Sequence, residues 1–285
     1  MSKIKIAVVG CSGLVGSTML KVLKERGVDA DLVCIKKLSL QIIRDTRPDY
    51  ALMAVSADLS KIWTPVFVKY GTVVIDNSSH FRQNPKVPLI VPEVNADQIK
   101  SAKIIANPNC STIQSVIPLS LLNKDNKIKK IIYNTYQAKS GAGAETLREF
   151  IKKPDFNVIP FIQDEEEKMI NETKKILNDF NLEIYATCVR VPVRNCHLVS
   201  IYVEFESIID FEKIKTLLNP RKMITPVEAD GFDEIFVCRL RQNNDRSISF
   251  ITVADNLRKG AATNAVQILQ GILRNKHKGI DDGGK

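Results

Sequence analysis

Residues 4–16 read IKIAVVGCSGLVG, an apolar run that passes directly into three evenly spaced glycines. Apolar residues then recur with helical spacing as far as Arg26, so the stretch predicts a strand, a tight turn and a helix. Glycines in such a turn let the backbone approach a pyrophosphate, which lies at the N-terminal end of the helix. The stretch therefore predicts a dinucleotide-binding loop, with a plain tight turn as the alternative. The residues that we expect to bind the cofactor are Gly10, Ser12, Gly13, Leu14, Val15 and Gly16.

The first 110 residues continue the alternation of apolar strands with amphipathic helices. Strands are expected at 31–35, 50–55, 72–75 and 103–106, and a further helix at 60–70. This alternation is typical of a parallel sheet covered on both faces. We therefore predict an N-terminal Rossmann-like dinucleotide-binding domain.

The middle of the chain has longer strands in which apolar and polar residues alternate. This pattern predicts a mixed or antiparallel sheet with helices on one face, and hence a C-terminal mixed-sheet α/β domain. The expected strands are 128–137, 183–191, 197–206, 236–241 and 247–254, and the expected helices are 144–152, 164–179 and 261–274. We expect residues 1–109 and 255–285 to form the first domain, to which the last helix returns, and residues 110–254 to form the second.

The end of the second strand bears on the choice of dinucleotide. A carboxylate usually binds the ribose there, but this chain has Lys36 and Lys37. Two lysines favour NADP over NAD, although both could simply be solvated. Asp29 and Asp31 lie about 20 residues after the glycines but precede or open the strand.

Composition narrows the class of protein. The 285 residues carry 41 basic and 32 acidic side chains, a formal charge of +9, but the basic residues are scattered and aromatics are only 6%. We therefore expect no nucleic-acid partner. The apolar runs fall short of a membrane span and the N-terminus lacks the pattern of a cleaved signal peptide, so we expect a cytoplasmic protein. Six cysteines without a CxxC pair and three histidines give no support to a metal site, and we expect reduced cysteines.

Cys110 is the cysteine that suggests chemistry. It lies in the segment Asn107-Pro108-Asn109-Cys110-Ser111-Thr112, just before an apolar helical stretch. The unpaired N–H groups at a helix N-terminus favour a thiolate and stabilise an oxyanion on a thioester carbonyl. A nucleophilic cysteine needs a base, and His197 is the best placed of the histidines. The alternative for His197 is a buried imidazole bonded to the backbone.

Taken together, these segments resemble the phosphorylating aspartate-semialdehyde dehydrogenase family. The matching motifs occur in family order and span nearly the whole chain. Besides the glycine loop they are residues 76–85, 87–95, 107–112, 135–143, 172–176, 187–193 and 255–262. The resemblance implies a glyceraldehyde-phosphate-dehydrogenase-like catalytic and dimerisation domain, a homodimer, and NADPH-dependent reduction of L-4-aspartyl phosphate to L-aspartate 4-semialdehyde. That reaction serves the biosynthesis of lysine, diaminopimelate, methionine and threonine.

The resemblance also implies roles for individual residues. Cys110 would form the acyl thioester, His197 would act as acid and base, and Gln137 would orient the substrate. Arg190 would hold the substrate carboxylate and Glu165 the substrate amine. The remaining roles are phosphate binding by Arg82, Lys168 and Asn109, and contact with the nicotinamide end of the cofactor by Ser140, Gly141 and Asn256.

The chain departs from the family pattern by being shorter. Material is missing after the second strand, where the family usually carries a segment for the 2′-phosphate, and between Phe150 and Phe156. Two rival functions remain: a related reductase of another acyl phosphate, such as N-acetylglutamyl phosphate, and a shortened, non-catalytic paralogue. Glu165 argues against the first, since an acetylated nitrogen offers no cation. The survival of Cys110 and its partners argues against the second.

Overall fold

The computed structural model describes residues 3–281, with side chains as far as residue 275. It divides into two compact units: unit 1 comprises Met1–Pro108 and Ala261–Lys285, and unit 2 comprises Asn109–Gly260. Asn109 and residues 255–260, which we expected in the first domain, fall in unit 2. The reason is local, because Asn256 bonds to Ser140 and Gly260 packs against Cys110, both of unit 2.

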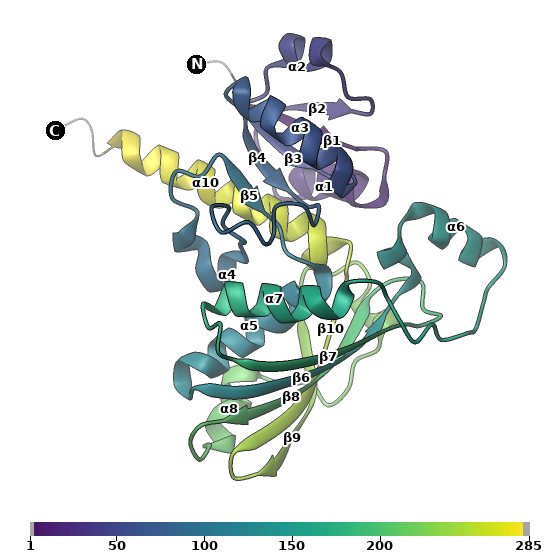
Figure 1. Cartoon of the computed structure of the whole chain (residues 1–285), viewed down its shortest axis with the longest axis vertical. Helices are drawn as coiled ribbons and strands as arrows, with labels where there is room; N and C mark the ends of the chain where they lie inside the picture. Colours follow the sequence, from purple (N-terminus) through teal and green to yellow (C-terminus); the bar gives the residue numbers. More distant parts are fainter. Residues whose placement is uncertain (1–2, 282–285) are drawn as a thin grey trace. The chain divides into compact units, whose positions relative to one another are not determined.

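Unit 1 is built on a parallel sheet with the strand order β2-β1-β3-β4-β5 (Figure 1). Its strands are β1 Lys5–Val9, β2 Asp31–Ile35, β3 Tyr50–Met53, β4 Val73–Asp76 and β5 Ile104–Ala106. Its helices are α1 Leu14–Glu25, α2 Leu40–Thr46, α3 Ala57–Lys69, α4 Pro92–Asn95 and α10 Thr263–Asp281, with a 3₁₀ turn at Ala96–Gln98. The order reverses between β1 and β3, and in such sheets ligands bind outside the carboxyl ends of the strands at this reversal.

Both faces of this sheet are covered, as the apolar strands predicted. Met19 and Leu23 of α1 pack in one core cluster with Val266 of α10, which follows unit 2 in the sequence. Ile43 of α2 and Phe67 of α3 belong to the cluster on the other face. The helix α2 was not predicted from the sequence. It begins where Ser39 caps its first turn by accepting a hydrogen bond from the Ile42 N–H.

Unit 2 holds a mixed sheet with the order β7-β6-β8-β10-β9, in which only the β6–β7 pair is parallel among the described strands. Its strands are β6 Ile128–Gln137, β7 Glu183–Arg190, β8 His197–Phe205, β9 Phe236–Asn244 and β10 Ser247–Ala254. Its helices are α5 Cys110–Asp125, α6 Ala144–Lys152, α7 Glu165–Leu177, α8 Phe211–Leu218 and α9 Pro226–Ala229, with a 3₁₀ turn at Lys139–Ala142. A π-helical turn at Arg258–Ala262 begins in unit 2 and ends in unit 1. The predicted two-domain α/β fold class is confirmed.

The two faces of the unit 2 sheet differ. Leu119 and Leu122 of α5, Met169 of α7 and alternate residues of β8 such as Val199 and Ile201 form one buried core. The intervening side chains of β6 and β7 point to the other face, where some large apolar side chains remain exposed. Helices therefore cover one face, as the alternation of apolar and polar residues predicted.

Within residues 3–281, none of the helices combines the length and the apolar character that crossing a bilayer demands.

Candidate active site

The glycine loop of unit 1 connects β1 to α1, as predicted. Gly10 has a φ of 79°, and a Cβ built there would lie 2.3 Å from the carbonyl oxygen of Ala54. A Cβ on Gly16 would lie 2.3 Å from the carbonyl oxygen of Gly10. Any other residue at either position would push the loop away from β3 or from α1. The two glycines are therefore required for this tight turn.

The same loop presents the first turn of α1. Gly13 is the N-cap residue, Ser12 before it is exposed, and Leu14 and Val15 begin the helix. Backbone N–H groups in the first turn of a helix lack helical acceptors and bind phosphate oxygens. The loop therefore fits the pyrophosphate of a dinucleotide.

The structure corrects one expectation here. Cys11 and Cys34 form a disulfide, whereas we expected reduced cysteines. The two residues are 23 apart in the sequence, but the parallel pairing of β1 with β2 brings Cys34 beside Val8, close to the loop. Of the cysteines outside the disulfide in the described chain, Cys188, Cys196 and Cys238 are buried as expected, and Cys110 is half-buried.

Lys36 and Lys37 directly follow β2 and are exposed. Asp31 opens the same strand, and Asp29 forms an ion pair with Lys3. The two ends of this five-residue strand are roughly 13 Å apart at about 3.3 Å per residue. Because a dinucleotide ribose is read at the carboxyl end, the lysines lie at the relevant end of β2 and Asp31 lies at the opposite end.

Arg82 is buried in unit 1, where its guanidinium holds backbone carbonyls. Its Nε donates to the carbonyl oxygen of Asn107 at 2.9 Å, and its Nη2 donates to that of Asn77 at 2.9 Å. The side chain thus ties the segment after β4 to the segment after β5. The phosphate-binding role of Arg82 stays a prediction.

In unit 2, Cys110 is the first residue of α5, where the sequence predicted a helix N-terminus. Asn109 caps the helix, since its side-chain oxygen accepts hydrogen bonds from the N–H groups of Ser111 at 2.9 Å and Thr112 at 3.4 Å. A Cβ on Gly260 would lie 2.9 Å from the Cβ of Cys110. The cap fixes the start of the helix, and Gly260 leaves room for the cysteine.

Glu165 is the centre of a hydrogen-bonded cluster near Cys110. Its Oε2 accepts from the side-chain amides of Asn109 at 2.9 Å and Gln137 at 3.1 Å, and its Oε1 forms an ion pair with Lys168 at 3.0 Å. Burial, the largest effect, raises the pKa of Glu165, but Lys168 and the hydrogen bonds outweigh it and hold the pKa below its usual value. The cluster therefore carries an ionised, buried carboxylate.

Arg190 joins this cluster to the imidazole of His197. Its Nη1 donates to the carbonyl oxygen of Ala138 at 2.8 Å and, at 3.5 Å, to Gln137 Oε1. Burial lowers the pKa of Arg190, whereas the charges of nearby Cys110 and Glu165 raise it. The guanidinium therefore lies within electrostatic reach of both the thiol and the carboxylate.

His197 is fully buried, and its tautomer is fixed by a backbone group. Its Nδ1 accepts a hydrogen bond from the Ala138 N–H at 3.0 Å, so the hydrogen of the neutral ring is on Nε2. Burial and the charge of Arg190 lower the pKa of His197 to about 3. Among the described residues, Nε2 has no hydrogen-bond partner. The ring is therefore neutral and offers one buried N–H.

Gly141 leaves the space in front of this ring. A Cβ built on it would lie 2.7 Å from Arg190 Nη1 and 2.9 Å from His197 Cε1. Its neighbour Ser140 exchanges hydrogen bonds with Asn256, whose Oδ1 also accepts from the N–H of Cys196 at 2.9 Å. Ser140, Gly141 and Asn256 therefore lie together beside the catalytic candidates, and their contact with nicotinamide stays a prediction.

Two further residues, for which the sequence predicted no role, contact the candidate site. Glu172 accepts a hydrogen bond from the Asn109 N–H at 2.6 Å, and Gln114 donates to the carbonyl oxygen of His197 at 3.3 Å. Glu172 is seven residues after Glu165 on α7 and therefore on the same face of the helix. That spacing is a signal that could have found it; the role of Gln114 depends on tertiary packing.

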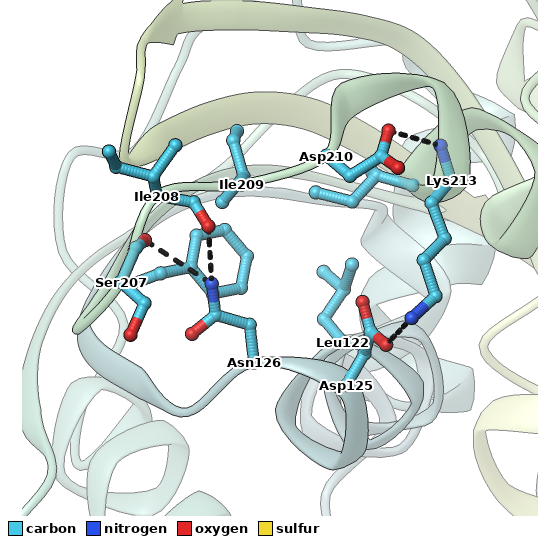
Figure 2. A pocket seen from close by; sticks show the side chains of 10 residues that line it. Leu122, Asp125, Asn126, Ser207, Ile208, Ile209, Asp210 and Lys213 are labelled. Carbon is cyan, nitrogen blue, oxygen red and sulfur yellow. Dashed lines mark hydrogen bonds and ion pairs between the residues drawn. The ribbon is translucent and has the colours of Figure 1, made fainter.

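Two other features of unit 2 lie apart from this cluster. A cavity of about 360 Å³ is lined by residues such as Asp125, Asn126 and Lys213 (Figure 2). It lies at the carboxyl end of α5, roughly 22 Å from Cys110 at about 1.5 Å per residue.

The second feature is a group of three side chains, in which Cys196 lies near Asp230 and Asp255. Burial raises the pKa of the Cys196 thiol, and Asp255 accepts hydrogen bonds from backbone N–H groups of its own turn. Neither feature needs a ligand to explain it.

Comparisons with known proteins agree with this geometry. Residues 33–102 match the family model described as semialdehyde dehydrogenase, NAD binding domain, and residues 119–259 match semialdehyde dehydrogenase, dimerisation domain. Aspartate-semialdehyde dehydrogenase of Aquifex aeolicus is 38% identical over 95% of this chain and 98% of its own length. The Bacillus subtilis enzyme is 36% identical over 94% and 97%.

A solved structure shows similarity to the same family of enzymes. Aspartate semialdehyde dehydrogenase II of Vibrio cholerae, complexed with ASA, superposes with a TM-score of 0.89 at 32% identity, over 96% of this chain and 99% of its own. The alignment with the Aquifex protein spans 333 positions against the 285 residues of this chain, so the relative has segments that this chain lacks. The chain belongs to the aspartate-semialdehyde dehydrogenase family, as a shortened member.

Proposed function

We propose that this protein catalyses the NADPH-dependent reduction of L-4-aspartyl phosphate to L-aspartate 4-semialdehyde, and its reverse, through a thioester on Cys110. The observation that carries the proposal is the cluster in unit 2. A cysteine at a helix N-terminus lies near a guanidinium, and one hydrogen-bonded set joins that guanidinium to an ionised carboxylate and a neutral imidazole. The relatives' names identify the semialdehyde as their substrate.

The charged groups suit the two ends of an amino acid. The planar guanidinium of Arg190 can hold a carboxylate with two parallel N–H donors, and the ionised Glu165 can hold an ammonium group. The side chains of Arg190 and Glu165 are already held in place by other hydrogen bonds. Substrate binding therefore does not have to fix their conformations. The substrate carbonyl would thereby lie against Cys110.

The chemistry divides into acyl transfer and reduction. The thiolate of Cys110 attacks the acyl phosphate, and phosphate leaves with the electron pair of its bond to the acyl carbon. The dinucleotide, when bound, supplies the hydride that converts the thioester into a tetrahedral alkoxide. That alkoxide re-forms a carbonyl and returns an electron pair to the sulfur of Cys110. The aldehyde is then free and the thiolate is restored.

In these reaction steps, His197 is suited to act as a hydrogen-bond donor. Its Nε2 carries the hydrogen because Nδ1 accepts from Ala138, and its pKa of about 3 keeps the ring neutral. A buried N–H stabilises a developing alkoxide, and that alkoxide collapses without giving up a proton. The base role that we expected for His197 would require its imidazole to accept a proton. This geometry favours donation instead, since acceptance on Nε2 requires Nδ1 to be protonated and the bond from Ala138 to break.

The ionised Glu165 also bears on the rival substrates. N-acetylglutamyl phosphate has a neutral amide where aspartyl phosphate has an ammonium group, and a buried carboxylate facing a neutral amide is costly. The non-catalytic alternative has no such support, since Cys110, Gln137, Arg190 and His197 are all held by specific contacts.

The function is tested by oxidising L-aspartate 4-semialdehyde in the presence of inorganic phosphate. We expect formation of reduced dinucleotide that depends on both the semialdehyde and phosphate, and much less with N-acetylglutamate semialdehyde. A higher kcat/KM for the acetylated compound would establish that the protein is a reductase of N-acetylglutamyl phosphate. Tight cofactor binding without turnover of either compound would establish a non-catalytic paralogue.

Replacing Lys168 by alanine tests the phosphate site. We expect Lys168→Ala to raise the KM for phosphate about tenfold and the KM for the semialdehyde less, because a charge-assisted contact of about 1.5 kcal/mol is lost. Lys174→Ala is the matched control, since Lys174 lies on the same helix, about 9 Å further along. A selective rise in the KM for the semialdehyde would contradict the phosphate role. It would mean instead that Lys168 acts through its ion pair with Glu165 on binding of the substrate amine. We expect the same preference for phosphate in Arg82→Ala.

The cofactor is proposed to be NADP, with a preference that is weak and sensitive to salt. Lys36 and Lys37 are exposed, and each contact with a 2′-phosphate should contribute on the order of 1 kcal/mol, or about fivefold. Salt screens exposed charges, so the ratio of kcat/KM for NADP to that for NAD should fall as ionic strength rises. A strong preference that salt leaves unchanged would require a buried phosphate pocket, which these lysines do not form.

We propose a homodimer formed through the uncovered face of the unit 2 sheet. Tyr136 on β6 and Tyr185 on β7 are exposed on this face, and Val189 and Leu198 flank Tyr136 on the two neighbouring strands. Large apolar side chains on an uncovered sheet are typical of an interface. Sedimentation equilibrium should give twice the chain mass of 31.9 kDa, and Tyr136→Lys should shift the mass towards the monomer.

A further inference from the structure

The disulfide between Cys11 and Cys34 joins two parts of the proposed cofactor site. Cys11 lies between Gly10 and Ser12 in the glycine loop, and Cys34 is two residues before Lys36. The Cα atoms are 5.6 Å apart, an ordinary separation for such a bond. The bond thus ties the loop that would hold the pyrophosphate to the strand whose end would face the ribose.

The two sulfur-bearing residues differ in access. Cys11 is only 4% exposed, whereas Cys34 is exposed on β2, which is an edge strand of its sheet. A thiolate that attacks a disulfide must reach one of its sulfur atoms, and exposed disulfides are the labile ones. Lys36 and Lys37 follow Cys34 closely in the sequence, and their positive charges attract an anionic thiol such as glutathione. The bond is therefore placed for exchange with small thiols.

The backbone around the bond is already in a compact conformation. The N–H of Gly10 donates to the carbonyl oxygen of Ile35 at 2.9 Å, and the N–H of Gly13 donates to that of Gly10 at 3.0 Å. A cross-link beside these bonds restrains the loop in the conformation that presents the first turn of α1. Restraining a loop in its binding conformation reduces the ordering cost of binding.

We propose that Cys11 and Cys34 form a reversible thiol–disulfide switch, in which oxidation tightens dinucleotide binding at the glycine loop. This inference rests on the proposed cofactor site. The oxidant is a disulfide of the glutathione type. The two S–H bonds of Cys11 and Cys34 and the S–S bond of the oxidant break, one protein S–S bond forms, and two glutathione thiols leave with both electrons and both protons. Reduction is the reverse. In a reducing compartment such as the expected cytoplasm, disulfides are usually transient and redox-sensing.

The first measurement is the number of free thiols after equilibration in glutathione buffers, counted by maleimide labelling of the denatured full-length protein and mass spectrometry. The chain has six cysteines, and four of them lie outside the disulfide: Cys110, Cys188, Cys196 and Cys238. We expect six labels at the reducing end of the series and four at the oxidising end, with Cys11 and Cys34 unlabelled. A count that never changes across the series would overturn the switch.

The second measurement is the Kd for NADP, determined by titration calorimetry on oxidised and reduced Cys110→Ser protein, so that oxidation of the catalytic thiol cannot contribute. We expect the oxidised form to bind about three- to tenfold more tightly. Adding Cys34→Ser should abolish the difference, and adding Cys238→Ser, a buried thiol on β9, should preserve it. Equal Kd values in both redox forms would overturn the switch alone. Failure of both forms to bind NADP would overturn the proposed cofactor site as well.

Discussion

Cys110→Ser is expected to lower kcat by about a thousandfold or more while NADPH binding is retained. Cys110 begins α5 with Asn109 as its cap, near the charge of Arg190. Serine preserves the helix start and nearly the size of the side chain, but its hydroxyl stays protonated where a thiol ionises. Steady-state rates of semialdehyde oxidation, together with calorimetric titration of NADPH, measure the two effects separately.

The matched control is Cys238→Ser, which makes the same chemical change at a buried thiol on β9. Its rate should stay close to that of the unchanged protein once both proteins are shown to be folded. If Cys110→Ser retained a substantial fraction of the rate, Cys110 would not be the nucleophile and the thioester mechanism would be wrong.

Gly141→Ala is expected to lower kcat by roughly a hundredfold with little loss of thermal stability. The added methyl group would lie 2.7 Å from Arg190 Nη1 and 2.9 Å from His197 Cε1, so the guanidinium or the imidazole must move. A displacement on the order of 1 Å in a catalytic site costs about a hundredfold in rate. The measurement is kcat and the KM for the semialdehyde, with the melting temperature recorded alongside.

Gly271→Ala on α10 serves as the comparison for Gly141→Ala, because a Cβ there meets nothing within 4 Å among the described residues. It should leave the rate unchanged and, within a helix, raise stability slightly. A normal rate in Gly141→Ala would mean that the space beside His197 and Arg190 is not used in catalysis.

The sequence predicted the regular parts of the fold well because each carries a local pattern. The strands expected at 31–35, 128–137 and 247–254 have the bounds of β2, β6 and β10. Elements with weak local signals were not predicted. The helix α2 is only seven residues long and contributes one buried side chain, that of Ile43, so its sequence lacks a repeated apolar face. Its position depends on packing against the sheet.

In the candidate site, too, features with a local sequence signal were predicted, and features that depend on tertiary contacts were not. The sequence placed Cys110 at a helix start because the apolar run after it is a local signal, and the structure confirms that start. It did not reveal that Nδ1 of His197 accepts from Ala138, because the two residues are 59 positions apart and meet only through the pairing of sheet strands. The disulfide between Cys11 and Cys34 was missed for the same reason, since the pairing of β1 with β2 brings these residues together.

The most direct test of the account is to detect the thioester itself. The protein is mixed with L-aspartate 4-semialdehyde and NADP without phosphate, then quenched in acid and analysed by intact and peptide mass spectrometry. We predict one aspartyl group per chain, attached to Cys110, together with one equivalent of NADPH, and release of the group as aspartyl phosphate when phosphate is added. NADPH formation without any acyl group on Cys110, or an acyl group on another residue, would contradict the account.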